Sequence, residues 1–140
     1  MMATRKIIVT RDDCDRLVEL LKDDVLAAIA DPKALRELAG ELERATVVDA
    51  ASVPKDVVTM NSTVKLTDLK SKETETYTLV YPEDANIAES RLSILAPIGI
   101  AILGYRVGDR VRWAIPAGKS DVRIDEVLYQ PERDSVAARS

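Results

Sequence analysis

The chain has 140 residues, of which 46% are apolar and 31% are charged, and its formal net charge at pH 7 is −4. This balance is typical of one folded domain with a small extension, not of a disordered chain. An acidic chain also lacks the basic face that a protein needs to neutralise phosphates, so the composition argues against direct binding of nucleic acid.

The chain contains no histidine and a single cysteine, Cys14. These counts exclude the usual zinc sites and any Ser-His or Cys-His nucleophile. No phosphate-binding glycine motif occurs either, so we expect no metal, no cofactor and no enzyme of the usual kinds. One unpaired cysteine, and the absence of any stretch near ~20 apolar residues, favour a cytoplasmic protein that does not contact the membrane.

Two helices are expected near the start of the chain. Thr10 followed by Asp13 is a variant of the capping box, and apolar residues then recur at helical spacing to about residue 22. Asp31 is suited to a second N-cap and Pro32 to the first helical position. Residues 23–31 could extend the first helix or form part of the connection. The simplest interpretation is a short antiparallel helical hairpin, or coiled coil, within residues 1–50.

Beyond residue 50 the pattern changes to a period of two, which predicts β-strands. Pro97 is expected to begin a short helix and Gly104 to end it. The polar tail after residue 129 is expected to be loose. The predicted fold class is α+β, in which residues 51–140 form an antiparallel sheet with one short crossing helix. The predicted strands are 57–66, 74–81, 90–96, 110–115 and 122–129.

Motifs in this second part resemble those of a known family. The order of "VVTMNSTVKL", "TYTLVYP", "LSILAPIGIAILGYRVGD" and "VRW" is similar to the C-terminal, FK506-binding-protein-like (FKBP-like) domain of the Gre transcript-cleavage factors of bacterial RNA polymerase. The motifs "DVVTMNS", "LVYP", "APIG", "VGD" and "YQPE" resemble more closely the Rnk family, regulators of nucleoside diphosphate kinase and shortened members of the Gre superfamily. One departure is Ala96, which stands where Gre factors usually carry serine.

The resemblance implies a binding site at the start of the short helix. In Gre factors this part of the chain docks on a coiled coil at the rim of the secondary channel of the polymerase. The expected partner-binding residues are therefore Leu95, Ala96, Pro97 and Ile98. The alternative interpretation is a core helix that only fills space. Both can hold, because a helix buries one side and leaves its N-terminal end accessible.

The resemblance also gives a possible role to the hairpin tip, Asp23, Asp24 and Asp31. In Gre factors a long coiled coil carries paired acidic residues that help to hold a magnesium ion for RNA cleavage. Here each arm has about 12 to 20 residues, or roughly 20–30 Å, and the aspartates do not reproduce that pair. They could equally be solvated residues and a helix cap. We expect a regulator that docks on bacterial RNA polymerase at the secondary channel and competes with Gre factors without stimulating transcript cleavage.

Two other functions stay open. An FKBP-like fold is compatible with prolyl isomerisation, although fold alone does not carry function, and the chain has one tryptophan and no phenylalanine for an aromatic pocket. The family name suggests instead an effect on nucleoside diphosphate kinase, by contact or through its expression. Copurification from cell extract would discriminate between the functions. Recovery of polymerase subunits would support docking on RNA polymerase, and recovery of the kinase would support an effect on that enzyme.

Overall fold

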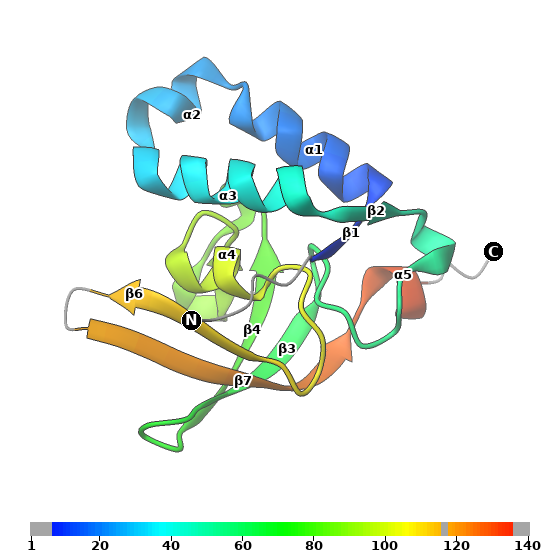
Figure 1. Ribbon diagram of the computed structural model, residues 1–140, viewed down its shortest axis with the longest axis vertical. Helices are drawn as coiled ribbons and strands as arrows, with labels where there is room; N and C mark the ends of the chain where they lie inside the picture. The colour runs from blue at the N-terminus through cyan, green and yellow to red at the C-terminus, as the bar shows by residue number, and fades with distance from the viewer. Residues whose placement is uncertain (1–6, 116–117, 136–140) are drawn as a thin grey trace.

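The computed structural model describes residues 7–115 and 118–135. Within them a pair of long helices lies over a curved sheet, and one short helix lies between the two layers (Figure 1). The helices are α1 (Arg11–Leu21), α2 (Asp24–Ile29), α3 (Pro32–Arg44), α4 (Pro97–Ile102) and α5 (Pro131–Asp134). The strands are β1 (Ile8–Thr10), β2 (Thr46–Val48), β3 (Thr63–Asp68), β4 (Thr74–Val80), β5 (Arg91–Ser93), β6 (Arg110–Ile115) and β7 (Gly118–Tyr129). None of the described helices is long and apolar enough to cross a membrane.

Both predicted helix starts are confirmed. The Thr10 hydroxyl accepts a hydrogen bond from the Asp13 amide at 3.1 Å, and an Asp31 carboxylate oxygen accepts one from the Lys33 amide at 3.0 Å. Pro32 follows in the first turn of α3, where a missing N–H costs nothing. Residues 23–31, for which two readings were open, form the separate short helix α2 in the connection.

The base of the hairpin carries two short strands that the sequence pattern did not predict. β1 and β2 pair in parallel, and with three residues each they are too short to show a period. The Ile8 amide donates to the Gly104 carbonyl at 3.2 Å. Gly104 has a φ of +82°, and a Cβ placed there would lie 2.4 Å from the Cβ of Ile7. The loop after α4 therefore packs directly against the chain that enters the hairpin.

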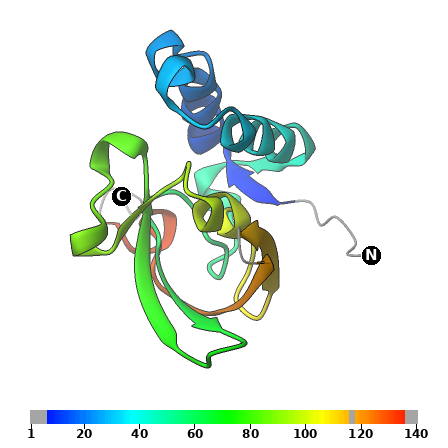
Figure 2. The ribbon, with the colours of Figure 1, turned by 90° about the vertical axis from the view of Figure 1, so that its left-hand side faces the viewer.

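The main sheet has the order β5-β4-β3-β7-β6 and is antiparallel except for the parallel pair β4 and β5. Figure 2 shows that it curves strongly and that α4 lies on its concave side. The predicted α+β class, with a helical hairpin and a mostly antiparallel sheet, is confirmed. Buried side chains of the hairpin and of the sheet form one apolar cluster, which includes Leu17, Leu38, Leu42, Met60, Leu79, Ile94, Ile102 and Ile124.

The predicted strand 57–66 is wrong over its first six residues, because β3 begins at Thr63. Residues 57–60 are all buried, which no alternating strand would produce. The amide of Thr59 donates to the Ser62 hydroxyl at 3.0 Å, and the two hydroxyls lie 2.8 Å apart. Asn61 takes a positive φ of 66° in the turn that results. The Ser62 hydroxyl thus satisfies the Thr59 amide within a turn, where an alternating strand would have used a ladder bond.

The expectation of a loose tail is wrong for residues 130–135. Gln130 is 1% exposed, and its side-chain amide donates to the carbonyls of Pro54 at 2.9 Å and Val57 at 2.8 Å. The helix α5 follows directly. Residues 136–140 lie outside the described part of the chain, as do residues 116–117 of the predicted turn between the last two strands.

Two predicted boundaries also moved. β7 begins at Gly118, before the predicted residue 122, and pairs with β6 through Ile115. β5 keeps only Arg91–Ser93 of the predicted strand 90–96, because a turn begins after Ser93 and leads into α4. Pro97 begins the short helix as predicted.

Candidate docking site

The predicted docking residues span the end of the turn after β5 and the first two residues of α4. Ser93 shapes this turn: its hydroxyl accepts a hydrogen bond from the Leu95 amide, and its carbonyl accepts one from the Ala96 amide, each at 3.0 Å. Ala96 is the N-cap of α4 but has no side-chain acceptor to offer. Pro97 is exposed, whereas Leu95, Ala96 and Ile98 are half-buried. The segment therefore presents an apolar surface at the start of α4.

The opposite side of α4 is packed into the core. Ile100 is 6% exposed and Ile102 is fully buried. Gly99 lies so close to the preceding turn that a Cβ would stand 2.4 Å from the Ser93 carbonyl oxygen. The helix thus fills the core, as one interpretation predicted, and this packing holds residues 95–98 in place at its accessible end.

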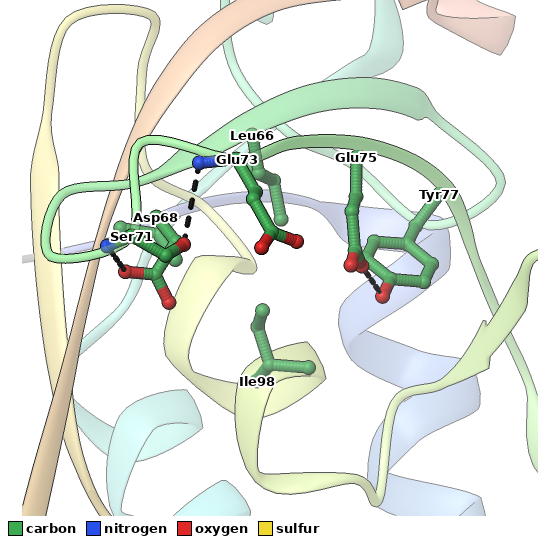
Figure 3. A pocket seen from close by; sticks show the side chains of 8 residues that line it. Leu66, Asp68, Ser71, Glu73, Glu75, Tyr77 and Ile98 are labelled. Atoms are coloured by element: carbon green, nitrogen blue, oxygen red, sulfur yellow. Dashed lines mark hydrogen bonds between the residues drawn. The ribbon is translucent and has the colours of Figure 1, made fainter.

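A pocket of about 130 Å³ opens beside Ile98, between α4 and the β3–β4 hairpin. Figure 3 shows Ile98 facing the side chains of Glu73, Glu75 and Leu66 across this space. Its other lining residues are Asp68, Ser71, Tyr77 and Val122. The pocket thus combines an apolar floor with an acidic rim.

Two of the rim groups are already bonded locally. Asp68 accepts hydrogen bonds from the backbone amides of Lys70 at 2.8 Å and Ser71 at 3.0 Å, and these bonds lower the pKa of its carboxyl group. Tyr77 donates its hydroxyl to Glu75, and this hydrogen bond is the main reason that the pKa of Tyr77 rises to about 12. Sequence reasoning did not select this pocket, although Glu73, Glu75 and Tyr77 alternate along the chain.

The hairpin tip holds the three predicted aspartates on its surface. Asp23 caps α2, since its carboxylate accepts from the amides of Val25 at 2.9 Å and Leu26 at 3.1 Å. Asp31 caps α3 in the same way, and Asp24 lies exposed in the first turn of α2. Among the residues that the structure describes, no group of three or more carboxylate, cysteine or histidine side chains could hold a metal ion.

A second polar cluster, also missed from the sequence, joins α1 to the sheet. The Asp13 carboxylate accepts a hydrogen bond from the Met60 amide at 3.2 Å and faces the Tyr81 hydroxyl at 3.5 Å. Burial, and then the negative charge of Glu132, raise the pKa of Asp13 to about 6. The Arg16 guanidinium lies 3.8 Å above the centre of the Tyr81 ring. The only sequence sign of this cluster was the capping position of Asp13.

Two family descriptions match the chain. Residues 5–48 match "Rnk N-terminus", and residues 53–129 match "Transcription elongation factor, GreA/GreB, C-term". The regulator of nucleoside diphosphate kinase from Escherichia coli strain K12 is 39% identical, over 94% of this chain and 95% of that protein. Transcription elongation factor GreA from Trichlorobacter lovleyi is 36% identical, over 69% of this chain and 61% of that protein.

A solved structure is also similar along most of the chain. It is described as a prokaryotic transcription elongation factor GreA/GreB from Nitrosomonas europaea, with a TM-score of 0.73 and 42% identity. The similarity covers 90% of this chain and all of that one. With matches in both its helical and its sheet parts, the chain belongs to the Rnk family within the GreA/GreB superfamily.

Proposed function

We propose that this protein is a cytoplasmic transcription regulator that docks on bacterial RNA polymerase at the rim of the secondary channel. It competes there with Gre factors and does not stimulate transcript cleavage. Membership of the GreA/GreB superfamily supports the choice of partner. The docking surface is the accessible segment 95–98 at the start of α4, whose opposite side is packed into the core.

The observation that carries the second half of the proposal is the short reach of the hairpin. α1 has 11 residues and α3 has 13, so at ~1.5 Å per residue they are only about 16 and 20 Å long. Two of the tip aspartates, Asp23 and Asp31, already accept backbone hydrogen bonds as helix caps. A carboxylate must approach magnesium to ~2 Å to ligate it, and attraction across a longer gap is screened by salt.

A cleavage assay on backtracked elongation complexes tests this mechanism. We expect no cleavage when this protein is added alone. As its concentration rises in the presence of a Gre factor, cleavage should fall, because two ligands that share one site exclude each other by mass action. Cleavage by this protein alone would contradict the short-reach argument, and constant Gre-dependent cleavage at saturating amounts would contradict the shared site.

The docking surface itself is tested by Ile98→Lys. The long lysine side chain can extend toward the carboxylates of the adjacent pocket, so the fold should survive, but the apolar contact surface is lost. A matched control is Leu128→Lys, since Leu128 is 46% exposed near the far end of β7. We expect weaker binding to core polymerase for the first variant only, at unchanged melting temperature. Undiminished affinity of a folded Ile98→Lys protein would show that residues 95–98 are not the site.

A second candidate function comes from the name of the Escherichia coli relative, which is a regulator of nucleoside diphosphate kinase. This chain could act on that enzyme by contact or through its expression. A tagged chain recovered from cell extract should carry polymerase subunits if the first proposal holds. Recovery of the kinase without polymerase would favour the second.

A further inference from the structure

The pocket beside Ile98 holds carboxylates that the fold leaves unneutralised. Its lining contains no lysine or arginine. Among the residues that the structure describes, neither Glu73 nor Glu75 lies within ion-pair distance of a basic side chain. On β6 and β7 the opposite holds, because Asp121 pairs with Arg112 and Asp125 with Arg123, each at 2.8 Å.

The strand register explains why the acidic groups meet apolar ones here. Glu75 lies opposite Leu66 in the antiparallel pair β3 and β4, so both side chains project from the same face of the sheet. Leu66 is 2% exposed and belongs to the core, whereas Glu75 and Glu73 lie further out and are exposed. Figure 3 shows Glu73 and Glu75 extending from this edge toward Ile98. The pocket therefore runs from a hydrophobic floor to two carboxylates.

A basic side chain is complementary to this pocket, because it combines an apolar part with a positive charge. Lysine and arginine each carry an apolar stem that ends in a cation, and such stems commonly lie along apolar surfaces while the charge reaches polar groups. An arginine fits particularly well, because its planar guanidinium can donate to two carboxylates. A neutral apolar side chain would instead bury the two carboxylates without a counter-charge, with only the Tyr77 hydroxyl bonded to Glu75, which is unfavourable.

The pocket is also continuous with the proposed docking surface. Ile98 both lines the pocket and ends the segment 95–98. A partner that contacts Ile98 would thus also lie beside the pocket.

We propose that the pocket between α4 and the β3–β4 hairpin receives a basic side chain, best an arginine, from the polymerase surface that docks on residues 95–98. This inference rests on the proposed docking to polymerase. Glu73 and Glu75 bind the cation, while Leu66 and Ile98 contact its stem. The pocket then gives specificity for a partner with a basic residue at one position.

The test is the double variant Glu73→Gln/Glu75→Gln, which removes both charges and keeps the shapes. Its matched control is Asp84→Asn/Glu126→Gln, because these residues are exposed outside the pocket and the charge change is equal. Affinity for core polymerase is measured at low and at physiological salt. We expect the pocket variant to bind about tenfold more weakly or worse at low salt, with a smaller salt dependence, and the control to bind within about twofold of wild type.

The outcomes separate the two proposals. If wild type binds polymerase and the folded pocket variant binds equally well, the pocket assignment is overturned while docking stands. If both double variants lose affinity equally, the effect is one of net charge and the pocket assignment is again overturned. If wild type does not bind polymerase, the proposed function fails and the inference built on it fails too. Equal melting temperatures of the variants are the control for folding.

Discussion

Replacement of Asp13 by asparagine is expected to stabilise the protein at pH 7 but not at pH 4. Asp13 is an ionisable group of α1 that is pressed against the sheet, where it meets the Met60 amide, the Tyr81 hydroxyl and the negative charge of Glu132. Burial disfavours its charged form. The pKa of Asp13 is therefore raised from 3.8 to about 6 on folding.

The size of the effect follows from this shift. A difference of about two pKa units, at about 1.4 kcal/mol per unit, corresponds to about 3 kcal/mol between the protonated and ionised forms. The folded state binds a proton more tightly than the unfolded state. The tighter binding of this proton therefore stabilises the folded state fully below pH 3.8. The stabilisation declines as pH rises toward 6 and is absent above it.

Asparagine stays neutral at every pH and can still accept the Met60 N–H through its side-chain oxygen. That hydrogen bond is weaker than one to a carboxylate, and the lost strength offsets part of the gain. We expect a net increase in the free energy of unfolding of about 1–2 kcal/mol at pH 7. At pH 4 the difference between variant and wild type should be close to zero.

The assay is urea unfolding of wild type and variant at several pH values between 4 and 7, compared as a difference curve. Subtraction is needed because hydrogen bonds lower the pKa of Asp68, Asp121 and Asp125, and their contribution is lost at lower pH. The control is Asp12→Asn, which makes the same chemical change at an exposed position in the same helical turn. A variant at Asp13 that is less stable than wild type at pH 7, or a difference that does not change with pH, would refute the reasoning.

Three substitutions test the fold and should each be measured by chemical denaturation. Gly104→Ala should cost about 2–4 kcal/mol, because φ is +82° and the new methyl would meet the Cβ of Ile7 at 2.4 Å; a cost below ~1 kcal/mol would show that this contact relaxes freely. Leu38→Ala empties a fully buried position on α3 and should lower the free energy of unfolding by about 2–5 kcal/mol. Leu35→Ala, at a position that is only partly buried, should lower it less. Asp31→Ala removes the cap of α3 and should cost about 1 kcal/mol, with Asp24→Ala, which caps no helix, as the neutral comparison.

Features that depend on a few neighbouring residues were readable from the sequence. Thr10, the Asp31-Pro32 pair and Pro97 each mark a helix start, because a cap acts on amides only two or three residues away and proline fixes its own φ. Alternation along residues 110–115 and 122–129 likewise predicted two strands of the sheet. The same local motifs carried the family resemblance that the comparisons confirmed.

Features that depend on residues far away in the chain could not be predicted from the sequence. Residues 57–62 were predicted to be a strand, but distant side chains bond to them in a turn. The Gln130 amide donates to the Val57 carbonyl and the Thr59 hydroxyl donates to Glu132, each across 73 positions. Gln130 in turn lies in the C-terminal tail that the sequence predicted to be loose.

The candidate pocket shows the same division. Glu73 and Glu75 alternate like the polar side of any strand, so composition and spacing gave no reason to select them. Only the folded chain brings Ile98 of α4, more than twenty positions away, to face them. Sequence determines where a helix or strand is favourable because those preferences act over a few bonds. The tertiary structure alone decides which side chains share a pocket, because that depends on how the packed layers meet.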